Sequence, residues 1–398
     1  MKNSAYIVNC NNIMALPIIR LLGNENITIT TVFGISNKKS LYQSLINKSK
    51  FINKKIFFDE SIYAHNLIEK LIQSARELDH KPVLFIASDT DLDIISSYRD
   101  ILSEYFLFSL PSDKIINEIL NKDKFIELAE KLDLPTPKAV KISDISELSE
   151  TNFNFNFPFI IKPSWRTNEW LKKFKEKKVF VINNENNLVQ CIKSLMDFPS
   201  EYFVQELIEG PDSNIYCSFA ILNKNSEPIS MGFCQKLTQY PPQFGNTSIS
   251  RPVIKEELSS LSKKIFKKLG LVGYASIEFK LDERDNTFKI IEITPNRFNR
   301  QFATTTIQGL NLPYVLYCFE TGLPVTNNVL KESKKLWLSE VNEIRRIRFY
   351  EKKKLIEYFK LLVNLFRVKV FEIFDMRDIK PFLFLLKAMG IKNNNSIS

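Results

Sequence analysis

Two glutamates interrupt apolar strands, and their spacing predicts that they meet. Glu278 lies within YASIEFK and Glu292 within KIIEIT, and the polar turn sequence ERDN falls between the two strands. Such strands form a hairpin, in which an even spacing around the turn places both side chains opposite each other on one face. Neighbouring carboxylates repel unless a cation lies between them, so the pair predicts a site for a metal ion bound to nucleotide phosphates. Two solvated carboxylates on an exposed sheet face are the alternative.

A lysine at the end of an apolar run is the second unexpected charge. Lys162 follows FPFII, a stretch typical of a buried strand. The plain interpretation is a strand-end side chain that extends its ammonium group into solvent. The same pattern, a charged residue in an apolar strand, is the one seen at Glu278 and Glu292.

The counts of residue types exclude several classes of protein. The 398 residues are 44% hydrophobic and 25% charged, which is the composition of a folded globular protein. Only 10 residues are glycine, and none are arranged as GxGxxG or GxxxxGK, so the common dinucleotide fingerprint and the P-loop are absent. The only histidines, His65 and His80, have no neighbours that suggest a Ser-His-Asp hydrolase or a metal site.

The cysteines and the apolar runs indicate in which compartment of the cell the protein is expected. Five scattered cysteines without a CxxC pair cannot form a complete disulfide framework, which favours a reducing, cytoplasmic setting. The amino-terminal sequence MKNSAYIVNCNN lacks the apolar core of a secretory signal. No uncharged apolar run reaches the length of about 18 residues that a transmembrane helix needs.

The first part of the chain predicts an α/β domain. Apolar and β-branched runs at 5–9, 27–35 and 81–89, and a final short run at 106–111, read as strands and alternate with stretches of helical spacing. Alternation of this kind is typical of a doubly wound parallel sheet, which we place at residues 1–112.

After residue 112 the predicted type of secondary structure changes twice along the chain. A helix over 113–132 ends before the prolines of LPTP, and a mixed α+β body built on antiparallel strands follows up to about residue 328. The segment 329–398 is predicted to be a helical, aromatic and basic extension.

Several of these segments, taken in order, resemble the ATP-grasp superfamily over about residues 1–325. The resemblance rests on NKDKFIELAEKLDLPTP, FPFIIKPS, YFVQELIEGPD, IEFKLD and IIEITPNR. It implies a pre-ATP-grasp domain at 1–112 and a two-lobed ATP-grasp domain at 113–328, with a lid subdomain at about 135–208. More narrowly, QKLTQYPPQFGNTSIS and KPSWRTNEWLKKFKEKKVFV are similar to the carboxylate–amine ligase subgroup that includes D-aspartate ligase.

The resemblance implies roles for individual residues. Lys122, with Lys124 as the alternative register, and Lys162 take the positions of phosphate-binding lysines. It implies that adenine lies against Glu206, Leu207 and Ile208, and that Asp212 holds the ribose. It also implies that Glu278 and Glu292 bind Mg²⁺, with Mn²⁺ as the alternative.

One position departs from the superfamily pattern. Thr294 stands two residues after the second glutamate, where the superfamily has an asparagine that binds metal. A hydroxyl can bind Mg²⁺ but supplies no amide oxygen, and Asn296 is the candidate substitute if the strand bulges. The departure puts metal occupancy or rate in doubt.

The chemistry implied by the resemblance joins small-molecule carboxylate and amine substrates at the cost of ATP, through an acyl phosphate. Lys236 would contact the γ-phosphate or the acyl phosphate, while the planar forks of Arg297 and Arg300 suit a carboxylate. For each of the three, an ordinary surface residue is the alternative. Other functions left open are an ATP-grasp kinase-like enzyme and a nucleotide-binding regulatory protein without turnover.

The positive charge of the chain is concentrated in its last part. Residues 331–398 hold 16 Lys and Arg against 8 Asp and Glu, whereas residues 1–330 hold 39 against 37. A helix packed on the catalytic body is one interpretation, and a basic amphipathic helix on an anionic membrane surface is the other. No motif supports nucleic-acid binding. The resemblance also leaves a homodimer open.

Overall fold

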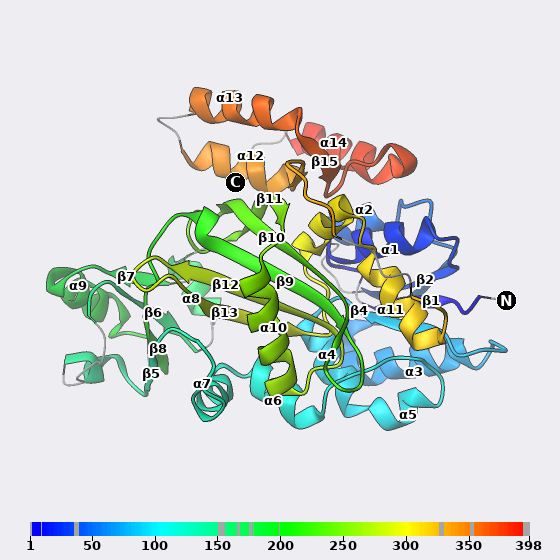
Figure 1. The fold of residues 1–398 in the computed structure, drawn as a ribbon, viewed down its shortest axis with the longest axis horizontal. Coiled ribbons are helices and arrows are strands. Elements are labelled where there is room, and N and C mark those ends of the chain that lie inside the picture. The colour runs from blue at the N-terminus through cyan, green and yellow to red at the C-terminus, as the bar shows by residue number, and fades with distance from the viewer. Residues whose placement is uncertain are drawn as a thin grey trace.

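The computed structural model has its lid at one end, its N-terminal domain at the other, and the C-terminal elements as a layer beside a large central sheet (Figure 1). Parts of the predicted lid segment, at 165–167, 175–176 and 178, and the polar tail at 393–398 lie outside the described residues. None of the described helices is long and apolar enough to cross a membrane. The described residues are 2–8, 10–35, 40–149, 156–164, 168–174, 177, 179–198, 200–325, 330–350 and 354–392.

The N-terminal domain is a four-stranded parallel sheet in the order β3-β2-β1-β4. Neighbouring residues of β1, such as Tyr6 and Ile7, enter different apolar clusters on the two faces of the sheet. This two-sided burial confirms the doubly wound α/β prediction. The elements are β1 (Ala5–Val8), α1 (Ala15–Gly23), β2 (Ile29–Ile35), α2 (Leu41–Ile46), β3 (Lys54–Asp59), α3 (Tyr63–Ala75), β4 (Val83–Ile86), α4 (Asp89–Ser97) and α5 (Arg99–Ser103).

Two details of this sheet differ from the sequence prediction. Strand β3, KKIFFD, was not predicted, because an edge strand buries only alternate residues, here Ile56 and Phe58, and begins with two lysines. The short strand expected at 106–111 is reduced to one bridge, between Val83 and Leu107.

The helix predicted over 113–132 is two helices, α6 (Asp113–Leu120) and α7 (Lys122–Lys131). Asn121 breaks it, because its backbone is extended and its side chain accepts hydrogen bonds from the amides of Asp123 and Lys124. The break places Lys122 at the first turn of α7.

The lid is a four-stranded antiparallel sheet in the order β5-β8-β6-β7. Its core contains aliphatic and aromatic side chains from all four strands together with Trp170 of α8. The elements are β5 (Ala139–Ile142), β6 (Phe159–Pro163), α8 (Asn168–Phe174), β7 (Phe180–Ile182), α9 (Glu185–Leu195) and β8 (Tyr202–Glu206).

The large sheet has seven strands in the order β13-β12-β9-β10-β11-β14-β15. All neighbours are antiparallel except β14 and β15. The elements up to residue 321 are η3 (Asp212–Asn214), β9 (Ile215–Leu222), β10 (Pro228–Tyr240), β11 (Asn246–Val253), α10 (Glu256–Leu269), β12 (Gly273–Asp282), β13 (Thr287–Pro295), η4 (Arg300–Gln308) and α11 (Leu312–Thr321).

The sequence predicts a helical C-terminal extension, but in the structure the extension also contains two strands. β14 (Leu336–Leu338) pairs with β11, and β15 (Val368–Phe371) pairs with β14, so both extend the large sheet. Their apolar and β-branched residues cover an edge that would otherwise stay open. The helices of the extension are α12 (Glu340–Phe349), α13 (Lys354–Leu365) and α14 (Lys380–Lys392).

The N-terminal domain and the large sheet share one apolar core. Ile7 and Phe85 of the parallel sheet pack in the same cluster as Phe219 of β9 and Phe298, which follows β13. The boundary near residue 112 is therefore a change of topology and not a gap between separate cores.

Candidate functional site

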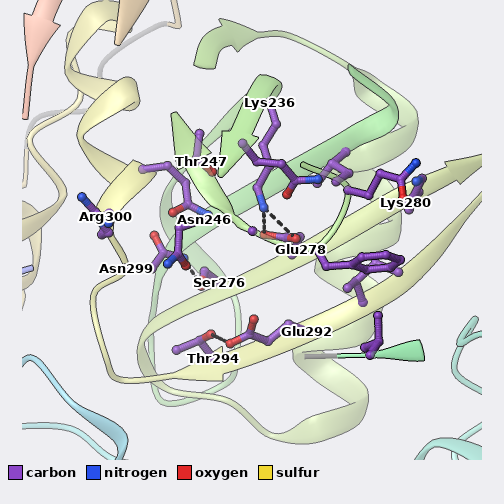
Figure 2. Close-up of a pocket in the computed structure, with 18 of the residues that line it drawn as sticks. Lys236, Asn246, Thr247, Ser276, Glu278, Lys280, Glu292, Thr294, Asn299 and Arg300 are labelled. Atoms are coloured by element: carbon purple, nitrogen blue, oxygen red, sulfur yellow. Dashed lines mark hydrogen bonds and ion pairs between the residues drawn. The ribbon is translucent and has the colours of Figure 1, made fainter. Parts of the chain in front are cut away.

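A cleft of about 480 Å³ opens where the lid, the large sheet and the N-terminal domain meet. Lys162 reaches it from the lid, whereas Lys236, Glu278 and Glu292 reach it from the large sheet. Figure 2 shows Lys236 pointing from its strand onto Glu278, with Glu292 on the neighbouring strand. Four charges that lie far apart in the sequence thus converge on one space.

The two glutamates lie opposite each other, as their spacing predicts. Glu278 of β12 pairs with Glu292 of β13 in the ladder, and both side chains line the cleft. A bulge follows Glu278, which leaves Ile291 without a partner in the ladder. Bulges of this kind often aim side chains at functional sites.

Lys236 is the internal counterion of Glu278. Its Nζ lies 2.9 Å from Oε1 and 2.8 Å from Oε2 of the carboxylate. Burial alone would lower the pKa of Lys236, but attraction to Glu278 outweighs it, so the pKa is raised and the lysine stays charged. The surface alternative for Lys236 does not hold, since its side chain is buried.

Among the residues that the structure describes, Glu292 is paired less closely than Glu278. Its side chain is 60% exposed into the cleft, and the Nη2 atom of Arg297 lies 3.5 Å away. Desolvation by the cleft walls, followed by repulsion from Glu278, raises the pKa of Glu292, although Arg297 opposes the shift. The exposed surface faces the cleft, so a bound ligand would cover it.

This pair of carboxylates fits a hydrated Mg²⁺ ion. Mg²⁺ is held by one or two carboxylates together with substrate phosphates, and not by an all-protein cage. Among the residues that the structure describes, no group of three or more His, Cys, Asp or Glu is arranged to hold a metal. Desolvation, and after it repulsion from Glu278, raises the pKa of Glu292, and a divalent cation between the two carboxylates would offset that repulsion.

Lys162 lies on the facing wall. Its Nζ donates to Oε1 of Gln205 at 2.6 Å. Desolvation and the positive charge of Lys122 lower the pKa of Lys162 to about 8. Lys122 lies at the adjoining part of the cleft, with Nζ 3.4 Å from the carbonyl of Ser164, whereas Lys124 is directed to Asn117. Of the two registers, only Lys122 is near Lys162.

The segment predicted to carry adenine also lines the cleft, at Glu206, Leu207 and Ile208. The carboxylate of Glu206 accepts from Arg284 at 2.6 Å, which fixes the end of β8 against the hairpin turn. Asp212, predicted for ribose, is not among the lining residues, and it accepts from Gln239 of the cleft wall at 2.8 Å.

Thr294 and Asn296 take different positions. Thr294 lines the cleft, and its hydroxyl lies 3.5 Å from Oε1 of Glu292 (Figure 2). Asn296 has φ of 45°, and its amide donates to the carbonyl of Ser109 at 2.6 Å. The turn therefore carries Asn296 away from the carboxylates, and the structure does not place it as a substitute ligand.

The two arginines line the cleft but are already paired. Arg297 donates from Nε to Asp89 at 2.6 Å. Arg300 forms a two-point ion pair with Glu372 of the C-terminal extension, and attraction to that carboxylate outweighs burial and raises the pKa of Arg300. The buried position excludes a plain surface role for Arg297.

Other polar residues of the cleft were not predicted from the sequence. Asp89 comes from the N-terminal domain, and Asn299 donates to Ser276 at 2.8 Å. Lys280 also lines the cleft. Ser276 and Lys280 flank Glu278 at alternate positions, so the hairpin pattern could have identified them. Asp89 and Asn299 could not be found in this way, because only the tertiary fold brings them here.

The lid, the large sheet with its carboxylate hairpin, and the cleft between them are the two-lobed ATP-grasp fold. The L-amino acid ligase from Bacillus licheniformis shares it, with a TM-score of 0.56 and 14% identity over 80% of this chain and 74% of that one. The biotin carboxylase domain of Hydrogenobacter thermophilus 2-oxoglutarate carboxylase, solved with MgADP, shares it too. Its TM-score is 0.61, with 14% identity over 84% of this chain and 74% of that one.

The sequence is similar to D-aspartate ligase of Enterococcus faecium, with 25% identity over 275 residues. The match covers 66% of this chain and 65% of that protein, so the chain spans just under two thirds of its relative. No protein-family model matches the sequence. The resemblance to the ATP-grasp superfamily, and within it to the carboxylate–amine ligases, is confirmed.

Proposed function

We propose that this protein is an ATP-dependent ligase that joins a carboxylate to an amine through an acyl phosphate. The observation that carries the proposal is the convergence of Glu278 and Glu292 with Lys162 and Lys236 from facing walls of one cleft. The similarity to D-aspartate ligase supports it. Acid–amino acid ligation is the finer form of the proposal.

The first step moves a phosphoryl group. A carboxylate oxygen of the acid attacks the terminal phosphorus of ATP, the bond to ADP breaks, and an acyl phosphate forms. Lys162 and Lys236 neutralise phosphate oxygens in this step, which is mainly positioning and charge compensation. Glu278 and Glu292 would hold Mg²⁺, or Mn²⁺ in its place, which supplies further positive charge to the phosphates.

The second step forms the amide. The amine nitrogen attacks the acyl carbon, the bond to phosphate breaks, and the nitrogen loses a proton. Arg297 lies between Asp89 and Glu292 at the end of the cleft that borders the N-terminal domain, so we place the acid substrate there. Glu372 already binds the fork of Arg300, so Arg300 acts in this proposal by shaping that end of the cleft.

Transfer of a carboxylate oxygen tests the proposal directly. Acids labelled with ¹⁸O in the carboxyl group, supplied with ATP and pooled amines, should yield inorganic phosphate that carries one labelled oxygen. ADP formed without label in phosphate would contradict the acyl-phosphate route, and a stable phosphorylated acid would favour a kinase-like enzyme.

A nucleotide-binding protein without turnover is the second candidate, and one observation favours it. Thr294 replaces the expected asparagine, and the side-chain amide of Asn296, two residues further on, is bound to Ser109. Tight ATP binding without ADP release, for every acid and amine supplied, would support this candidate over the ligase.

Nucleotide affinity should weaken as the pH rises above about 8, because Lys162 has a pKa of about 8 in the free protein. Phosphate raises that pKa, so binding is fully favoured below pH 8 and is lost as the pH rises through the pKa of the complex. Calorimetry at pH 8 in buffers of different ionisation enthalpy should show proton uptake.

Substitutions of the two lysines sharpen this test. In Lys162→Arg the alkaline loss should vanish, because arginine keeps its charge. In Lys122→Gln the loss should move to higher pH, because one neighbouring positive charge is gone. A flat wild-type profile between pH 7 and 9.5, without proton uptake, would contradict the assignment of Lys162 to phosphate.

A further inference from the structure

Helix α13 presents its apolar side chains to solvent and its one acidic side chain to the protein. Its inner face carries Glu357, which pairs with Arg346 at 2.8 Å, and Leu361, which packs against the large-sheet edge. Figure 1 shows α13 at the outer edge of the C-terminal layer. The outward side chains of the helix, with their exposed fractions, are Leu355 (86%), Phe359 (67%) and Leu362 (59%), and Phe366 (87%) follows directly after its last residue.

These positions form one continuous stripe. They follow the spacing of a single helical face, and Ile356 and Val363 beside them are also exposed. A monomeric protein rarely leaves such a stripe in water, so the face marks a contact with another apolar phase or surface. The exposed Leu383 and Leu386 on α14 add further apolar side chains to the same C-terminal layer.

The charges around the stripe have one sign. Among the described residues from 340 to 392, none of the acidic side chains is exposed, because they are buried or half-buried in the fold. Glu343 and Glu357 hold Arg346, Glu372 holds Arg300, and Asp378 holds Arg20. The exposed basic residues in the same range are Arg345, Arg348, Lys360, Lys369, Arg377, Lys380 and Lys387.

The exposed apolar stripe and the positive charges around it together indicate what kind of partner this face binds. A second copy of the chain would bring the same exposed cations toward each other across a two-fold axis, which is unfavourable. A nucleic acid would attract the basic side chains, but its phosphates would make no favourable contact with the exposed leucines. An anionic lipid surface suits both, since its headgroups attract the basic side chains and its acyl boundary takes the apolar stripe.

We propose that α13, with the adjoining basic residues of α12 and α14, docks this protein on an anionic membrane surface. The helix has 12 residues, so it is about 18 Å long and lies in the interface and does not span the bilayer. The docking surface itself does not depend on the ligase reaction.

Flotation of the full chain with vesicles tests the proposal. The protein should partition into vesicles in which roughly a third of the lipid is phosphatidylglycerol, and much less into phosphatidylcholine alone. The double variant Phe359→Asp/Leu362→Asp should partition about 100-fold more weakly, because two apolar side chains no longer enter the acyl boundary. Arg345→Gln/Arg348→Gln/Lys387→Gln should weaken partitioning about tenfold or more at low salt.

A matched control is available in the lid. Met196 follows α9 and is 66% exposed, so Met196→Asp exchanges one exposed apolar side chain for an aspartate outside the proposed surface and should partition as the unaltered protein does. Thermal unfolding checks that each variant is folded. No partitioning into anionic vesicles, or equal partitioning of the Phe359/Leu362 variant, would overturn the proposal. So would a dimer that this variant dissociates, which sedimentation velocity detects.

Discussion

Replacing Glu292 by alanine is expected to lower ADP formation on the order of 10³-fold and to leave the protein folded. The carboxylate lies opposite Glu278 and faces the cleft, so its loss removes half of the predicted cation site. Desolvation and repulsion from Glu278 both raise the pKa of Glu292, so the substitution removes a carboxylate that is costly to keep charged. We therefore expect an unchanged or slightly higher Tm together with lost turnover, measured as ADP release.

The exposed carboxylate of Glu257 on α10 supplies the control, since Glu257→Ala removes the same charge far from the cleft. That variant should retain turnover. Full ADP release by Glu292→Ala would sink the assignment of the cation site to the hairpin, and a large fall in Tm would mean that Glu292 is structural.

Lys236→Met should reduce both turnover and stability. The substitution keeps the length of the side chain but removes the charge that lies 2.8 Å and 2.9 Å from the two oxygens of Glu278. Turnover should fall about 10²- to 10³-fold if Lys236 neutralises phosphate charge. Stability should fall by roughly 1–3 kcal/mol, because a largely buried carboxylate is left without its partner.

Added Mg²⁺ distinguishes the two roles of this lysine. In Lys236→Met the ion can take the place of the ammonium group beside Glu278, so it should restore part of the lost Tm but not the lost turnover. Lys267→Met, on the exposed face of α10, is the control and should change neither quantity. Normal turnover in Lys236→Met would remove this lysine from the proposed mechanism.

The carboxylate hairpin was predictable from the sequence because its geometry is local. Alternation and one turn fix which residues of β12 and β13 face each other, and the register of Glu278 with Glu292 follows. Lys162 was predictable for the same reason, as a charge in a strand that is otherwise apolar. In each case a charged residue interrupts a local apolar pattern, and this interruption can be recognised in the sequence without knowledge of the tertiary fold.

Contacts between distant segments were not predictable in this way. Asn296 is turned from the carboxylates by the carbonyl of Ser109, and Arg300 is bound by Glu372 of the extension. Strands β14 and β15 escaped prediction because they are short and lie in a segment whose composition favours helix. Only the completed fold shows which charges of the cleft are already paired.

The pairing of Arg300 with Glu372, and of Arg20 with Asp378, has a consequence for protein synthesis. On the ribosome, both arginines emerge long before the acidic residues that neutralise them, and a buried arginine without its partner costs several kcal/mol. The nascent chain can therefore fix Arg300 at the wall of its cleft only after Glu372 has left the exit tunnel. Translation products that end before Glu372 keep the hairpin and its lysines but lack the ion pair that holds Arg300 in place, so this part of their cleft stays unfinished.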